Sequence, residues 1–427
     1  MDNLVLVHLE SVSEFIFHTN SHLFPNINKL MQESIYYPHY YSSATSTLMV
    51  MSDLCYGGMY RETCTKLENN FNNVGNHRSL FDELKDAGYY VKGIIWPEIL
   101  TYSKIVNGDV LGRKIEVSAA EDYGSFIEGI DAAVSQKEPF ALFVANFVSH
   151  VSYRNDKEVK GSNSYVRWKE GYRLVDDTCG KIIELLKKYG KNDHTLVVFY
   201  GDHGDDYWGH RFHNGYTHAV EPYGSIIHTP LLFRNSQAEG GIDSNLMSSF
   251  DVKDKILSLL LGWSFTGGRE YIFARNIYAN QAVNFLSLSK GYAAATNEYL
   301  LLVSARGLEL YNTDMDPANT CNLLEFFCIN EKGGIQFIPH FRAAKSMHFY
   351  DFFTDAEIGH LRYVYRLLRR ELLRRTEELY RSVAKDTQTR DRELNFYKIN
   401  RYHRYHLFRR KYVDILERQF RKRIVHK

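Results

Sequence analysis

Acidic residues and a histidine directly follow two apolar runs of this sequence. Glu10 comes after residues 4–9 (LVLVHL), and Asp202 and His203 come soon after residues 195–200 (TLVVFY). A carboxylate and an imidazole at a strand end can both reach one divalent cation. Either signal alone is weak, because an Asp-His pair often forms a turn and a Glu after a strand is often a surface residue. If the fold brings both ends together, the two segments predict a metal site.

A cluster of hydroxyl side chains precedes an apolar stretch with helical spacing. The cluster consists of Ser42, Ser43, Thr45, Ser46 and Thr47. In structural terms these residues cap a helix. In chemical terms, a hydroxyl at a helix N-terminus lies where backbone N–H groups favour an anion, and a nearby divalent cation makes it a nucleophile. Both interpretations can hold together.

The elements that must position these residues alternate between strands and helices over about 230 residues. This alternation predicts an α/β fold with a doubly wound, mostly parallel sheet, whose ligands bind beyond the carboxyl ends of the strands. Glu10 and the Asp202-His203 pair follow two such ends. The expected strands are residues 4–9, 89–95, 139–148, 195–200 and 230–233, and the expected helices are residues 25–31, 80–87 and 170–189.

The C-terminal third differs in pattern. A hairpin is expected at residues 299–304 and 307–311, and Arg-rich helical periodicity runs from Asp355 to about Lys385, with a second helical stretch from Asp391. We therefore expect a catalytic domain at residues 1–345, with a smaller subdomain at about 270–345, and a basic helical extension at residues 346–427.

The charge is distributed unevenly along the chain. Residues 361–427 hold 21 Lys and Arg against 8 Asp and Glu, whereas the rest of the chain holds 31 against 43. A basic tail of this kind suits an anionic partner, and we expect peripheral contact with an anionic membrane. The alternative is a solvated helical face that docks on the acidic body. Nucleic acid is a less favoured partner, because no recognised nucleic-acid fold surrounds the tail.

Targeting signals are not visible. The sequence shows no basic and apolar leader and no apolar run long enough to span a bilayer. Its five cysteines are odd in number and form no C-x-x-C pair, which favours a reducing compartment. These features lead us to expect a cytoplasmic protein, peripheral to the inner face of the membrane.

The order of the motifs resembles the sulfatase/alkaline phosphatase superfamily. Glu10 after the first strand, then residues 24–30 (FPNINKL), then Thr47 ten residues before Gly57 match that family's metal-binding acid, its "TPNLDKL"-like segment and its nucleophile at the start of a helix. The resemblance covers roughly residues 3–325. Further matching segments are residues 139–153, 172–204, 223–233 and 310–323.

The resemblance implies roles for the matching positions. Glu10, Asp202 and His203 would bind a divalent metal ion (Zn, Mn, Mg or Ca), with Thr47 as both ligand and nucleophile. Thr45 remains an alternative nucleophile. Two histidines would contact the transferred group or assist the leaving group, and they are His150 and His218, with His213 competing for the place of His218.

Departures from the family pattern indicate the subclass. Formylglycine-type sulfatases need Cys or Ser in a C/S-x-P-x-R frame, whereas Thr47 is followed by Leu48-Met49-Val50-Met51. Thr cannot give formylglycine. The sequence Leu9-Glu10-Ser11 with a Thr nucleophile looks more like phosphoethanolamine and phosphoglycerol transferases, which favours phosphoryl over sulfuryl chemistry.

The function expected from these patterns is a metal-dependent transfer of a substituted phosphate. The phosphodiester donor would pass its phosphoryl group to Thr47 and then to a glycan or lipid-linked acceptor, as in decoration of a bacterial surface polysaccharide. The alternatives are a sulfatase-like hydrolase or phosphodiesterase, and a non-catalytic binding protein on the same fold. Competent residues at all four metal-site positions speak against the binding protein.

Overall fold

The structure is a computed structural model, and it describes most of the chain. The described residues are 2–58, 77–97, 105–106, 109–136, 139–150, 157–206, 210, 218, 221–235, 239–276, 291–304, 307–329, 334–346 and 348–383. The expected helical stretch from Asp391 and most of the basic tail lie outside these residues.

The chain divides into two compact units. The first comprises residues 1–62, 68–219 and 225–272, and the second comprises residues 63–67, 220–224 and 273–427. All the expected metal ligands belong to the first unit.

A mostly parallel eight-stranded sheet forms the centre of the first unit. Five neighbouring strands (β5, β4, β6, β1 and β7) are parallel to one another. In contrast, β8 runs antiparallel to β7, and β2 runs antiparallel to β8. The five predicted strands and the α/β fold class are confirmed, although the fifth strand (β8) is antiparallel to its neighbour β7. The spatial order is β5 (Glu116–Ala119), β4 (Tyr90–Trp96), β6 (Phe140–Asn146), β1 (Asn3–Leu9), β7 (Thr195–Gly201), β8 (Leu231–Arg234), β2 (Ile35–Tyr36) and β9 (Gly241–Ile242).

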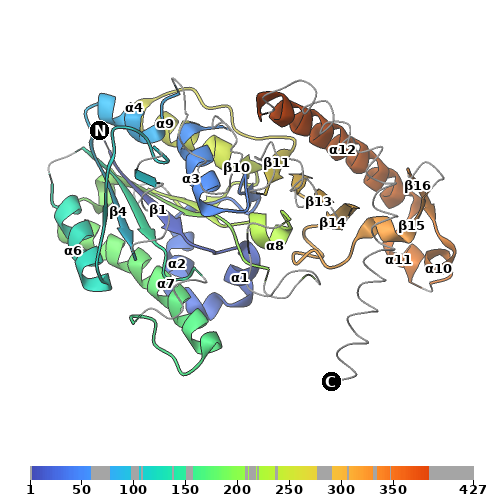
Figure 1. Cartoon of the computed structure of the whole chain (residues 1–427), viewed down its shortest axis with the longest axis horizontal. Helices are drawn as coiled ribbons and strands as arrows, with labels where there is room; N and C mark the ends of the chain where they lie inside the picture. Colours follow the sequence, from blue (N-terminus) through green and yellow to red (C-terminus); the bar gives the residue numbers. More distant parts are fainter. Residues whose placement is uncertain are drawn as a thin grey trace. The chain divides into compact units, whose positions relative to one another are not determined.

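Helices cover both faces of this sheet (Figure 1). On one face, Val5, Val7 and Leu9 of β1 belong to a core built with α1 (Glu14–Thr19), α2 (Pro25–Gln32), α6 (Tyr123–Val134) and α7 (Ser164–Lys188). The opposite face is covered by α3 (Thr47–Tyr56), α4 (Leu80–Asp86) and α9 (Ser249–Leu261). Because strand side chains alternate between faces, the even-numbered residues of β1 point toward this second layer. A short two-stranded sheet of β3 (Tyr40–Tyr41) and β10 (Met247–Ser248) pairs the segment before α3 with the segment before α9.

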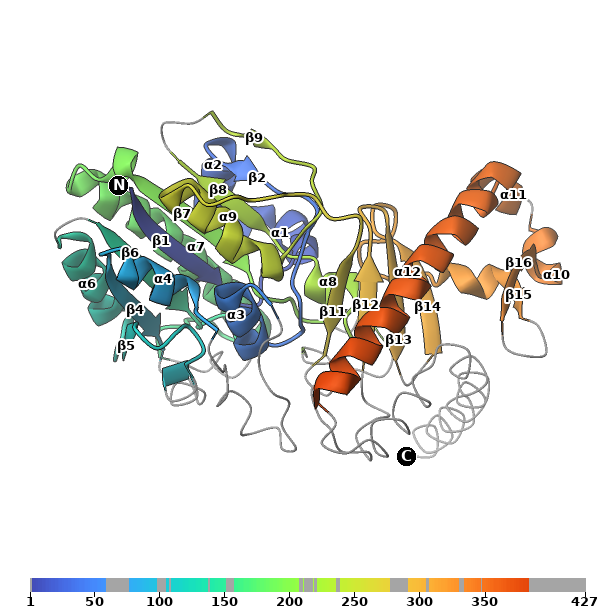
Figure 2. The ribbon, with the colours of Figure 1, turned by 90° about the horizontal axis from the view of Figure 1, so that it is seen from above.

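The second unit contains a four-stranded sheet and a long helix (Figure 2). The predicted hairpin is confirmed, with Leu301 of β13 paired to Leu310 of β14. The predicted Arg-rich helix is also confirmed. It packs on β12 and β13, and its Leu361 and Leu368 are buried. The elements are β11 (Ile272–Arg275), β12 (Tyr292–Ala295), β13 (Tyr299–Ser304), β14 (Gly307–Asn312), β15 (Phe327–Ile329), β16 (Ile335–Pro339), α10 (Phe341–Ala344), α11 (Phe349–Phe352) and α12 (Asp355–Val383).

Within the described residues, no helix combines the length and the apolar character needed to cross a bilayer.

Candidate metal centre and nucleophile

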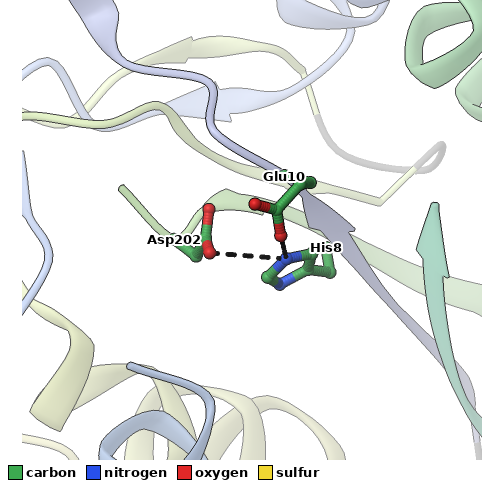
Figure 3. A group of neighbouring side chains, drawn as sticks. All are labelled: His8, Glu10 and Asp202. Atoms are coloured by element: carbon green, nitrogen blue, oxygen red, sulfur yellow. Dashed lines mark hydrogen bonds and ion pairs between the residues drawn. The ribbon is translucent and has the colours of Figure 1, made fainter. Parts of the chain in front are cut away.

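Strand pairing brings the two acidic strand ends together. In the register of β1 and β7, His8 lies opposite Tyr200. Glu10 and Asp202 each follow two residues later, so strand alternation directs all four side chains toward the same face. Figure 3 shows Glu10 and Asp202 converging on the ring of His8. All four residues are buried.

The turn after β1 holds both carboxylates in place. Ser11 adopts a positive φ of 57°, which is uncommon for a residue other than Gly. Its backbone N–H donates to Asp202 Oδ1 at 3.0 Å, and its hydroxyl donates to Glu10 Oε1 at 2.9 Å. Tyr172 donates from its hydroxyl to the Ser11 carbonyl at 2.9 Å, which anchors the turn from α7.

Two glycines let the chain pass through this crowded site. A Cβ atom on Gly201 would lie 2.4 Å from the Val12 carbonyl oxygen, and one on Gly204 would lie 2.2 Å from the Ser225 carbonyl oxygen. Both contacts involve backbone atoms, so a side chain at either glycine would displace the loop that carries Asp202.

His203 links the strand end to the hydroxyl cluster. Its Nδ1 lies 3.0 Å from the Gly204 carbonyl oxygen, which can only accept, so Nδ1 carries the ring proton. The neutral ring therefore has a lone pair on Nε2, which lies 3.1 Å from Thr47 Oγ1 and 3.2 Å from Asp202 Oδ2. Asp202 Oδ2 is buried and accepts no hydrogen bond from the described residues. A divalent cation could bind to both of these atoms.

Thr47 is the first residue of α3, and the side chain of its N-cap residue, Ser46, makes no capping hydrogen bond. The first turn of the helix therefore keeps its ability to bind an anion. Thr45 is fully buried and its hydroxyl has no hydrogen-bond partner among the described residues. The structure thus brings Thr47, not Thr45, into hydrogen-bonding distance of a proposed ligand.

A group of histidines lies beside His203. The ring of His218 stacks on His203 with centroids 4.3 Å apart, and the ring of His150 lies 5.0 Å from that of His218. His218 Nδ1 lies 2.9 Å from Asp205 Oδ1. Burial alone would lower the pKa of His218, but the hydrogen bond and charge of Asp205 outweigh it and raise that pKa. His213, the competing candidate, lies outside the described residues.

The buried charges at the strand ends are out of balance. Burial raises the pKa of Glu10 well above its usual range, and the charge of Asp202 raises it further. Burial also raises the pKa of Asp202, although His8 and the Ser11 hydrogen bond oppose this. Burial lowers the pKa of His203 well below its usual range, so this ring brings no positive charge. A divalent cation would compensate these carboxylates, and the oxygen and nitrogen donors fit Zn, Mn, Mg or Ca.

Sequence reasoning missed two residues of the site, His8 and Asp205. Within the part of the chain that the structure describes, His8, Glu10 and Asp202 form a group whose potential ligand atoms lie within 4.8 Å of one another. The spacing His8-Leu9-Glu10 in a strand places His8 and Glu10 on one face, which was a usable signal. Asp205 had only its nearness to Asp202 as a signal, because its partner His218 lies 13 residues further along the chain.

Solved structures with the same fold include sulfatases and a lipoteichoic acid synthase. A 2-O GAG sulfatase superposes with a TM-score of 0.62 at 13% identity, covering 91% of this chain and 96% of that chain. The lipoteichoic acid synthase LtaP from Listeria monocytogenes superposes with a TM-score of 0.55 at 15% identity, covering 73% and 85% of the respective chains. At these identities the likeness concerns the fold.

Sequence comparison gives relatives of the same kind. A lipoteichoic acid synthase from Staphylococcus saprophyticus is 22% identical over 297 residues, which is 60% of this chain and 45% of the relative. This chain therefore matches less than half the length of that relative. The sulfatase family model matches residues 2–263, which include every proposed metal ligand. The chain belongs to the sulfatase family.

Proposed function

We propose that this protein is a metal-dependent phosphoryl-group transferase with Thr47 as its nucleophile. The observation that carries the proposal is the Thr47 hydroxyl at the first turn of α3, 3.1 Å from His203 Nε2. A Thr at this position cannot supply formylglycine. The group transferred would be a substituted phosphate such as phosphoethanolamine or phosphoglycerol, and the acceptor a glycan or lipid-linked glycan. The likeness to lipoteichoic acid synthases supports the transfer of a substituted phosphate.

Glu10, Asp202, His203 and Thr47 would hold the divalent cation. When bound, it would lower the pKa of the Thr47 hydroxyl, which then loses its proton to solvent, and would polarise a phosphoryl oxygen of the donor. Hydrogen bonds from Ser11 keep Glu10 and Asp202 in position.

The transfer would take place in two balanced steps. In the first, Thr47 Oγ1 forms a bond to phosphorus, the bond from phosphorus to the leaving alcohol breaks, and His218 Nε2 gives a proton to the leaving oxygen. In the second, the acceptor hydroxyl returns a proton to His218 and attacks phosphorus, and Thr47 leaves and regains its proton from solvent. Asp205 holds His218 through Nδ1, so proton transfer uses Nε2. His150 would add positive charge or a hydrogen bond to the transferred group.

Mass spectrometry tests the nucleophile. We expect wild-type protein incubated with Mn²⁺ or Zn²⁺ and phosphatidylglycerol or phosphatidylethanolamine to carry an adduct on Thr47. The adduct should be absent from Thr47→Ala and present in Thr45→Ala, and its mass identifies the group. An adduct on Thr45 would identify Thr45 as the nucleophile and leave the rest of the mechanism unchanged. Metal-loaded protein without an adduct from any donor would contradict the transferase.

A hydrolase is the second candidate. It is favoured by the match to the sulfatase family model and by the superposition on a 2-O GAG sulfatase. A hydrolase would use water as the acceptor and release free sulfate from a sulfate ester, or a phosphate monoester from a phosphodiester, whereas the transferase would need an acceptor hydroxyl for turnover. Measuring turnover with and without a glycan acceptor separates the two.

A further inference from the structure

His8 lies among the proposed metal ligands, and its role is open because its ring could either bind the cation or hold a ligand. Its Nε2 is 3.0 Å from Glu10 Oε2 and 3.6 Å from Asp202 Oδ2, as Figure 3 shows. Its Nδ1 is 2.9 Å from the Tyr200 hydroxyl. His8 and Tyr200 are both fully enclosed. The position of the ring proton decides between the two roles, because a protonated nitrogen has no lone pair for a metal.

Tyr200 determines where that proton is. A phenol at neutral pH keeps its proton. Within the described part of the chain, the Tyr200 hydroxyl makes its hydrogen bond to His8. A buried O–H without an acceptor would cost about 1–3 kcal/mol, so Tyr200 donates to Nδ1. The neutral ring must then carry its proton on Nε2, where it points to Glu10.

Glu10 receives one donor on each oxygen in this arrangement. His8 donates to Oε2, and the Ser11 hydroxyl donates to Oε1 at 2.9 Å. Two fixed donors determine the rotation of the carboxylate, and each oxygen keeps a further lone pair for a cation. Aromatic rings also pack beside His8, with Phe147 at 5.1 Å and Tyr200 at 5.3 Å between centroids.

We propose that His8 is a positioning residue and not a metal ligand: Tyr200 sets its tautomer, and its Nε2–H orients Glu10 toward the cation. This rests on the metal site proposed above at Glu10, Asp202, His203 and Thr47. Residues that orient a ligand typically change metal affinity by about 10–100-fold when removed.

Ring NMR of the wild-type protein tests the tautomer without any substitution. With ¹⁵N-labelled histidine in metal-free protein, we expect the His8 signals to show a proton on Nε2 and a lone pair on Nδ1. A His8→Gln sample assigns the signals by subtraction. Addition of Mg²⁺ or Zn²⁺ should leave the proton on Nε2. Loss of that proton on metal binding would show that His8 is a ligand and overturn the proposal.

Calorimetric titration with Mn²⁺ gives the second readout. We expect His8→Leu to bind about 10–100-fold more weakly and Tyr200→Phe to lie between it and the wild type. His8→Gln should stay within about threefold of the wild type, because its amide N–H can replace the Nε2–H donor. Phe126→Leu, which changes a buried aromatic residue on the opposite face of the sheet, should leave the affinity unchanged.

The outcomes separate this inference from the proposed function. If His8→Gln binds Mn²⁺ as weakly as His8→Leu while the wild type binds it well, the imidazole lone pair is needed. That result would refute the positioning role of His8 but not the metal site. Unchanged affinity in His8→Leu would also overturn that role. If the wild type binds no divalent cation, the metal site itself falls.

Discussion

At the scale of single residues, the site is built from buried carboxylates that the protein only partly neutralises. Asp205 has His218 as its partner, and this hydrogen bond helps to hold the pKa of Asp205 low despite burial. Burial raises the pKa of both Glu10 and Asp202, although nearby histidines oppose this effect in part. In the metal-free protein, burial therefore favours protonation of these two carboxyl groups, whereas a bound cation would favour their ionised form.

This imbalance predicts how pH acts on metal-free protein. Because the pKa of Glu10 is raised on folding, its contribution to stability is present below the unfolded value of about 4.3 and is lost as pH rises toward the folded value. Urea unfolding in the presence of a chelator measures this effect. Between the unfolded and the folded pKa of Glu10, the free energy of unfolding of the wild type should fall, relative to that of Glu10→Gln, by up to about 1.4 kcal/mol per pH unit.

Saturating Mn²⁺ should reverse that trend, because only the ionised carboxylate binds the cation and binding then releases a proton. A wild type that keeps a constant stability difference from Glu10→Gln at all pH values, with and without Mn²⁺, would contradict the assignment of Glu10.

At the scale of secondary-structure elements, one helix caps another across the sequence. Asp176 of α7 accepts from the backbone N–H groups of Asn26 and Ile27, at 3.0 and 2.8 Å, and from the Asn26 side chain at 2.8 Å. These N–H groups belong to the first turn of α2, which has no side-chain cap of its own. The contact holds α2 on α7 on the face of the sheet opposite the candidate nucleophile.

We expect Asp176→Ala to lower the free energy of unfolding by about 2–3 kcal/mol, because it leaves one buried and two partly buried donors of α2 without this acceptor. Glu184→Ala on the same helix removes an exposed ion pair with Lys181 and should cost at most about 0.5 kcal/mol. Urea unfolding measures both. Equal effects of the two substitutions would show that Asp176 has no capping role.

At the scale of the whole molecule, the basic C-terminal segment contrasts with the acidic remainder of the chain. The described part of this segment is in α12, where Glu371 pairs with Arg374 and Arg375. Residues 384–427 hold 14 of the 21 Lys and Arg residues of this segment. We propose that this segment contacts anionic lipid surfaces, which would bring a lipid-linked donor or acceptor near the enzyme.

Vesicle sedimentation tests this contact. Binding to phosphatidylglycerol vesicles should weaken as salt is raised, because attraction between the tail and the lipid is screened. Neutralising Arg401, Arg404, Arg409 and Arg410 together should weaken binding at least tenfold, since each basic residue contributes about 1 kcal/mol near such a surface. Four substitutions of exposed basic residues on α7 and α4 serve as the control: Lys85→Gln, Arg173→Gln, Lys181→Gln and Lys187→Gln. Equal loss from both sets, or stronger binding to RNA than to vesicles, would contradict the membrane contact.

The sequence by itself determined the elements and the residues at their ends. Apolar runs predicted β1 and β7, and the acidic residues after them predicted where a cation would bind. The hydroxyl cluster before a helical stretch predicted that α3 begins near Thr47. These features are local, because hydrophobic period and capping chemistry act over a few residues.

Tertiary structure alone decided the pairing of distant residues. Alternation shows that His8 shares a face with Glu10, but the position of Tyr200 beside His8 depends on the register of strands about 190 residues apart. The same holds for Asp205 with His218, for Asp176 with α2 and for the antiparallel direction of β8. Local sequence does not encode which strand becomes a neighbour, because that choice depends on the packing of the whole core.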